Sequence, residues 1–132
     1  MPRLDRQEMA AIIAGGAAGA VLRVALARTN TGGPAAWPWI TFAVNLAGAF
    51  ALGYFATRLQ ERLPLSAYRR PLLGTGFCGA LTTFSTMQLE LLRMLDAHRY
   101  GLAAAYAASS VALGYAGIHA ATATVRRVRS PK

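Results

Sequence analysis

Four long stretches of the chain are almost free of charged residues, and polar segments rich in turn-forming residues separate them. The stretches cover residues 9–26, 39–57, 71–92 and 100–125. A helix needs about 20 residues to cross a hydrocarbon core of roughly 30 Å, so each stretch is long enough to span a bilayer. No stretch shows the polar–apolar alternation of a membrane β-barrel strand. The pattern predicts an all-α membrane protein, a single four-helix domain over residues 1–132.

The segments between the stretches carry turn signals. The first contains Pro34 and Pro38, the second contains Pro64, and a short polar turn occupies residues 96–99. A basic N-terminus before an apolar run is also typical of a secretory signal peptide. The acidic residues before the first run, and its length, favour a transmembrane helix instead.

The composition changes the range of possible functions. Of the 132 residues, 55% are hydrophobic and only 14% are charged, whereas soluble domains carry about 25% charged residues. These values exclude a disordered chain and argue against a water-soluble enzyme. Cys78 is the only cysteine, so no intrachain disulfide is possible. We interpret His98 and His119, which are far apart in the sequence, as structural or interfacial residues rather than metal ligands.

The net charge of +9 could indicate nucleic-acid binding, but the basic residues lie at the ends of the predicted helices. There they fit membrane anchors that contact lipid headgroups, so we expect no nucleic-acid partner. With four spans, one side of the membrane would hold Arg3, Arg6, Arg58, Arg62, Arg69, Arg70, Arg126, Arg127, Arg129 and Lys132, and the other side Arg23, Arg28, Arg93 and Arg99. By the positive-inside rule, this bias predicts both termini in the cytoplasm.

Small residues four positions apart predict close contacts between helices. Such contacts replace the hydrophobic effect as the force that holds helices together in lipid. The pairs are Gly15 with Gly19, Gly16 with Ala20, and Ala49 with Gly53, and longer rows run through Ala43, Ala47 and Ala51 and through Ala104, Ala108, Ala112, Ala116 and Ala120. So many small-residue faces on a small chain predict an oligomer.

Polar residues inside the spans are the candidates for function, because they are costly in hydrocarbon unless they are paired or functional. Thr41 and Asn45 share one face of the second helix, and Tyr106 and Ser110 share one face of the fourth. Asn45 could equally join two helices as a structural hydrogen-bonding group. Glu90 in the third span is either a functional carboxylate or one half of an interfacial ion pair with Arg93.

The third span has an unusual centre. Residues 74–86 contain three glycines and five hydroxyl residues, and glycine and threonine are poor helix formers. This composition predicts a local unwinding, with freed carbonyls that only protein or a water-lined cavity can satisfy at membrane depth. The alternative is an intact helix in which the hydroxyls bond back to the preceding turn.

These residues resemble the Fluc (CrcB) fluoride ion channel family over essentially the whole chain. Residues 15–23 are similar to the family pattern GGxxGxxxR, residues 41–48 to TxxVNxxG, and residues 76–86 to GFCGGxTTFSTF. The third run is the most specific of the three, because ordinary apolar helices do not carry it. The resemblance implies a passive, fluoride-selective channel that exports fluoride from the cytoplasm across the bacterial inner membrane, and no enzyme.

The resemblance also implies an antiparallel homodimer of dual topology in membrane lipid, with two pores and a structural sodium ion at its centre. Backbone carbonyls at the break, corresponding to Gly79 and Thr82, would hold the sodium. Arg23 would either steer anions toward the pore or have a structural role. The ion pathway would include Asn45, Phe84, Met87, Ser85, Thr86, Tyr106 and Ser110. Amide and hydroxyl groups donate hydrogen bonds and aromatic ring edges are electropositive, so such a pathway suits a small, strongly hydrated anion.

The chain departs from the family pattern at three points. Met87 replaces the second pore phenylalanine, and Gly114 stands where a small polar residue is usual. The charge bias also conflicts with dual topology.

Two other functions remain open at this stage. A small proton-coupled antiporter of the multidrug type also has four short helices. Such antiporters, however, resemble one another in having a carboxylate within the first helix. Here the acid nearest a membrane centre is Glu90, in the third span. A non-transporting membrane assembly protein would show no ion flux at all.

Overall fold

The computed structural model describes residues 5–29, 32–33, 36–61 and 68–128. The protein is all-helical in these ranges. Its elements, in chain order, are α1 (Arg6–Ala27), α2 (Trp39–Glu61), the π-helix η1 (Pro71–Cys78), α3 (Gly79–Leu81), α4 (Phe84–Asp96) and α5 (Tyr100–Arg127). Pro34, Pro64, Arg3, Arg62, Arg129 and Lys132, on which some of the sequence predictions rest, lie outside the described residues.

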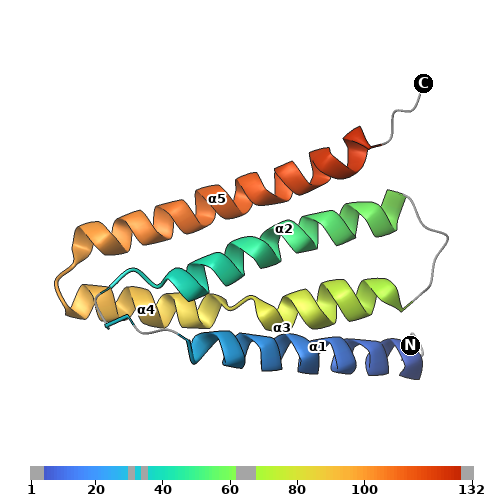
Figure 1. Cartoon of the computed structure of the whole chain (residues 1–132), viewed down its shortest axis with the longest axis horizontal. Helices are drawn as coiled ribbons and strands as arrows, with labels where there is room; N and C mark the ends of the chain where they lie inside the picture. The colour runs from blue at the N-terminus through green and yellow to red at the C-terminus, as the bar shows by residue number, and fades with distance from the viewer. Residues whose placement is uncertain (1–4, 30–31, 34–35, 62–67, 129–132) are drawn as a thin grey trace.

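Three of the helices are long and apolar enough to cross a membrane. They cover Arg6–Ala27, Trp39–Arg58 and Tyr100–Arg127, with mean hydropathies of 1.9, 1.5 and 1.3. These helices match three of the four predicted spans. The third predicted span is instead divided into η1 with α3, and α4, which follow one another along the bundle (Figure 1).

The ends of the helices gather at two opposite ends of the bundle. α1 begins, α2 ends, η1 begins and α5 ends at one end of the bundle (Figure 1). The turn predicted for residues 96–99 lies at the opposite end, where His98 adopts a left-handed conformation with φ 57°. The amide of Arg99 donates to the carbonyl of Met94 at 2.8 Å, which closes the end of α4.

Glycines allow two pairs of elements to pack backbone to backbone. α1 packs mainly on η1, and α2 packs mainly on α5. A Cβ atom at Gly19 would overlap the backbone of Phe77, and one at Gly76 would overlap the backbone of Ile12. The close contact predicted for the first helix is therefore confirmed, and it places α1 directly beside the unusual third segment.

The predicted rows of small residues on α5 and α2 behave differently. Gly53 of α2 does contact α5, because a Cβ there would lie 3.0 Å from the carbonyl oxygen of Ile118. Ala43 and Ala47 of α2 are exposed, as are Ala104, Ala108, Ala112, Ala116 and Ala120 of α5. The alanine row of α5 therefore makes no contact of this kind with the residues that the structure describes. α5 meets α2 through a neighbouring face, on which Ala121 and Val125 are buried.

The third segment is broken at Thr82 and Thr83. Thr82 has ψ 148° and Thr83 has φ −145° and ψ 105°, so both residues are extended between α3 and α4. The predicted unwinding is confirmed, and the alternative of an intact helix is wrong. One part of that alternative does occur, because the hydroxyl of Thr82 donates to the carbonyl of Cys78 at 3.0 Å.

Candidate functional site

The side chain of Asn45 holds the break from the neighbouring helix α2. Its Oδ1 accepts a hydrogen bond from the backbone N–H of Thr83 at 2.9 Å. Its Nδ2 donates to the carbonyl oxygen of the same residue at 3.3 Å. The Oδ1 atom thus replaces the helical acceptor that the N–H of Thr83 has lost, whereas the Thr83 carbonyl keeps its helical donor, the N–H of Met87 at 3.5 Å, beside the Asn45 amide. Gly48, one turn further along α2, lets the methyl group of Thr82 approach, because a Cβ there would overlap it.

This arrangement frees two backbone carbonyls. In a continuous helix the N–H of Thr83 would donate to Gly79 O, and the N–H of Thr86 would donate to Thr82 O. Instead Thr83 donates to Asn45, and Thr86 donates to the hydroxyl of Thr83 at 3.1 Å. The carbonyls of Gly79 and Thr82, which the family resemblance implies as sodium ligands, therefore lack their usual helical donors. These oxygens are the ligand type that hard cations prefer.

The hydroxyl groups at the start of α4 form a short chain. Thr83 caps α4 through its side chain, and its hydroxyl donates to that of Thr86 at 2.8 Å. The hydroxyl of Ser85 lies 3.3 Å from that of Thr83. The candidate residues Ser85 and Thr86 thus lie within one turn of the break.

Two pockets meet at Asn45 and Phe84. The larger one, of about 630 Å³, is also lined by Gly79, Thr82 and Arg70. The smaller one, of about 220 Å³, lies between α2, α4 and α5. Phe84, the first residue of α4, is 69% exposed. Asn45 and Phe84 are therefore the two candidate residues shared by both hollows.

The smaller pocket brings together residues that the sequence separates widely. Met87 of α4 lines it, as do Ser110 and Gly114 of α5. Both departures from the family pattern, Met87 and Gly114, therefore lie on a single pocket. Met87 is also part of a buried cluster with Met94, Ala103 and Tyr106.

Tyr106 does not line the 220 Å³ pocket that Ser110 lines, although the two residues were predicted to share a face. Tyr106 is fully buried, and its hydroxyl donates to Oε2 of Glu90 at 2.7 Å. The other carboxylate oxygen of Glu90 accepts a hydrogen bond from Thr41 at 2.6 Å. One carboxylate thus connects α2, α4 and α5. The sequence pattern predicted each of these three residues as a polar candidate, but it did not predict the bonds between them.

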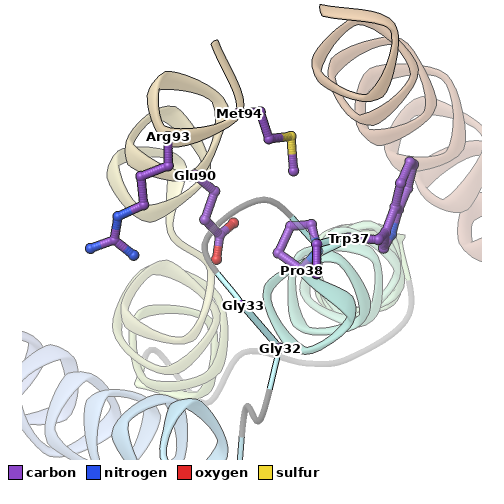
Figure 2. Close-up of a pocket in the computed structure, with 8 residues that line it drawn as sticks. Gly32, Gly33, Trp37, Pro38, Glu90, Arg93 and Met94 are labelled. Carbon is purple, nitrogen blue, oxygen red and sulfur yellow. The ribbon is translucent and has the colours of Figure 1, made fainter. Parts of the chain in front are cut away.

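Glu90 and Arg93 line a third pocket, of about 460 Å³, next to Trp37 and Pro38 (Figure 2). The Glu90 carboxylate points toward Gly33, whereas the Arg93 guanidinium extends away from the Glu90 carboxylate (Figure 2). Within the described part of the chain, Glu90 is bonded to two hydroxyl groups and forms no ion pair with Arg93. The ion-pair interpretation is therefore wrong.

Arg23 lies on α1 one turn after Gly19, whose backbone contacts Phe77 and Leu81 just before the break. The residue is half-buried, and its Nε has no hydrogen-bond partner within the described ranges. A buried guanidinium nitrogen without a partner is suited to an anion or to water. Among these same residues, no cluster of three or more His, Cys, Asp or Glu side chains could hold a metal ion.

Comparison with known proteins gives a consistent result. The family model described as "CrcB-like protein, Camphor Resistance (CrcB)" matches residues 10–122. The protein named "Fluoride-specific ion channel FluC 1" from Mycolicibacterium paratuberculosis is 60% identical over 129 residues, which is 98% of each chain. "Fluoride-specific ion channel FluC" from Phenylobacterium zucineum is 42% identical over 125 residues, covering 92% of this chain and 98% of that protein. The protein of the same name from Caulobacter vibrioides strain NA1000 / CB15N is 39% identical over 120 residues, covering 89% and 94%.

Proposed function

The chain belongs to the CrcB family, whose relatives found here are named fluoride-specific ion channels, and from this premise we propose that it conducts fluoride passively. It is a multi-pass bacterial membrane protein of a transporter family rather than an enzyme family. The single observation that carries the proposal is the position of Asn45, which lines both pockets at the helix break.

Asn45 has the chemistry to replace part of the water around fluoride. An amide nitrogen carries two hydrogens, and the carbonyl of Thr83 takes one of them. The second can donate to an anion in either pocket. The two bonds to Thr83 fix the amide in place, so the donor is preorganised before the ion arrives. A fixed donor stabilises the small fluoride ion more than a larger halide, because the larger ion fits the spacing poorly.

Other candidate residues extend the path on both sides of Asn45. The ring of Phe84 presents an electropositive edge to an anion, and the hydroxyl of Ser110 can donate a hydrogen bond. Ser85 and Thr86 add hydroxyls at the start of α4. Arg23 raises the local concentration of anions near the break through its charge. Tyr106 contributes to the path indirectly, through Glu90, because its hydroxyl already donates its hydrogen to that carboxylate.

We also propose that the third segment makes a fourth crossing, and that two copies of the chain pair around it. η1 with α3, and α4, run end to end beside the apolar helices (Figure 1). The exposed ring of Phe84 and the exposed alanine row of α5 are apolar or small surfaces that a second copy would cover. In an antiparallel homodimer, each copy would contribute one pathway, which gives two pores.

A structural sodium ion fits the same arrangement. The carbonyls of Gly79 and Thr82 are released by the bonds that Thr83 and Thr86 make elsewhere. Two oxygens are too few to replace the hydration shell of a cation, but a second copy would supply the same pair. Sodium held there would join the two copies at the break, and it would not take part in conduction itself.

Conduction down a gradient separates a channel from a proton-coupled transporter. Purified protein in liposomes loaded with potassium fluoride should release fluoride at the same rate with and without a pH gradient, with a potassium ionophore balancing charge. This rate is expected to exceed that of empty liposomes in both conditions. Release that requires the pH gradient would replace the channel with a coupled mechanism.

A further inference from the structure

The 220 Å³ pocket is lined on two sides by residues that offer an anion no side-chain donor. Met87 of α4 and Gly114 of α5 both line it. The thioether of methionine is a weak acceptor without a hydrogen to donate, and glycine has no side chain. A Cβ atom placed at Gly114 would have no neighbour within 4 Å. The pocket therefore has open space at Gly114, and this part of its wall cannot hydrogen-bond to fluoride.

Two other lining residues, Ser110 and Asn45, do supply donors. Elsewhere on α5, the hydroxyls of Thr124 and Ser109 donate to carbonyls one turn earlier, at 2.8 and 2.6 Å. Ser110 differs from both, since its hydroxyl has no such bond to any residue that the structure describes, and it lines the pocket. Asn45 lines the same pocket and retains one amide hydrogen after its bond to Thr83. The pocket thus has two free donors, set among otherwise apolar walls that include Phe42, Leu46 and Val111, and a volume several times the roughly 30 Å³ of one water molecule.

We propose that this pocket is a hydrated widening of the fluoride path, and that Met87 and Gly114 together set how much water the ion retains there. Water bound to Ser110 and Asn45 supplies the hydrogen bonds that Met87 and Gly114 cannot make. The inference rests on the proposed fluoride conduction and adds two residues that control hydration within it. A bulkier, less flexible side chain at position 87 would displace part of this water.

The reactivity of a thiol placed at Gly114 tests the proposal without measuring transport. The variant Cys78→Ala/Gly114→Cys has room for the new side chain, and it is exposed to the small water-soluble reagent 2-sulfonatoethyl methanethiosulfonate in proteoliposomes. The matched control is Cys78→Ala/Leu113→Cys, since Leu113 is 49% exposed on the same helix and does not line the pocket. Such reagents attack the thiolate, which apolar surroundings disfavour.

Three results are expected. The thiol at position 114 reacts at least about tenfold faster than the one at position 113, because only a hydrated thiol ionises readily. Modification at position 114 lowers fluoride efflux, since the pocket lies on the path. Adding Met87→Phe to the Gly114→Cys variant slows its modification several-fold, because the ring displaces water.

Equal reaction rates at positions 113 and 114, or a rate at position 114 that Met87→Phe leaves unchanged, would overturn the inference. Size-exclusion elution that matches the parent confirms that each variant is folded. The test is also separable from the proposed function. A parent protein that releases no fluoride contradicts conduction, whereas the labelling rates still report whether the pocket holds water.

Discussion

At the residue scale, Asn45 links the structure of the break to the chemistry of the path. Its amide binds both backbone groups of Thr83 and lines both pockets. A residue that only joined two helices would not need to face a hollow, and a residue that only bound an anion would not need to hold a backbone. The two bonds to Thr83 show the structural role of Asn45, and the proposed role in the ion path is compatible with it, although the sequence presented the two as alternatives.

Two substitutions of Asn45 should separate these roles. Asn45→Ala removes both bonds to Thr83 and should lower stability by about 1–3 kcal/mol, because a buried backbone donor is left unpaired. Asn45→Asp keeps the acceptor for the Thr83 N–H, so it should be less destabilising. Both variants should nearly abolish fluoride efflux from liposomes, the first by loss of a donor and the second by added negative charge. An Asn45→Asp channel that conducts like the parent would contradict the assigned role.

The two positions of the third motif at which the family has pore phenylalanines, Phe84 and Met87 here, should differ in their effect on fluoride efflux. Phe84 is exposed and borders both pockets, whereas Met87 is buried and borders one. Phe84→Ile should cut fluoride efflux severely, because it removes the ring edge, while folding and dimerisation persist. Met87→Phe should leave efflux unchanged or raise it. Efflux and size-exclusion chromatography check both. Loss of conduction in Met87→Phe with a silent Phe84→Ile would move the path away from this face.

Individual site residues were predictable, but their partners were not. The polar pair Thr41 and Asn45 was visible in the sequence because four-residue spacing places both on one helical face. Their different partners, Glu90 and the backbone of Thr83, depend on how α2 is rotated against α4. No spacing within one helix specifies that rotation. For the same reason the sequence did not predict that Tyr106, which is expected in the path with Ser110, bonds to Glu90.

At the scale of elements, the break could be located to a region but not to a residue. The glycines and hydroxyls of residues 74–86 weaken the helix along the whole run. The extended residues are Thr82 and Thr83, because Asn45 and Gly48 of α2 bind and accommodate them there. A contact with another helix therefore selects the site of unwinding within a region that the sequence makes weak.

The packing of α1 on η1 gives a matched test at this scale. Gly19→Ala should destabilise the protein by about 1–3 kcal/mol, because its Cβ would overlap the fixed backbone of η1. Gly16→Ala is the control on the same helix, since its Cβ would lie 3.9 Å from the nearest atom, the carbonyl oxygen of Gly76. Thermal unfolding in detergent should show a lower Tm for Gly19→Ala only. Equal Tm values for the two variants would mean that α1 and η1 pack less closely than described.

At the scale of the whole molecule, the charge pattern and the family pattern predict different assemblies. Arg58, Arg70 and Arg126 lie at the end of the bundle where α1 begins, and Arg28 and Arg99 lie at the opposite end. This distribution favours one orientation in the membrane, whereas an antiparallel dimer needs two. The sequence could not resolve this conflict, because insertion depends on the balance of charges and pairing depends on surfaces.

Dual insertion can be tested by labelling one position from each side of the membrane. In the variant Cys78→Ala/Lys132→Cys, an impermeant thiol reagent should label the protein from both the cytoplasmic and the external side. That result is expected because an antiparallel pair places one C-terminus on each side. Labelling from the cytoplasmic side alone would show that the arginine bias fixes a single orientation, and an antiparallel dimer would then be excluded.

The most direct test of the account compares two anions in the same proteoliposomes. Vesicles that contain only this purified protein are loaded with fluoride and chloride, and the efflux of each ion is recorded with ion-selective electrodes. The fixed amide of Asn45 and the ring of Phe84 predict rapid fluoride release, while chloride release stays at the level of empty vesicles. Equal release of both anions, or release of neither, would contradict the central claim that the break and its two pockets form a fluoride-selective path.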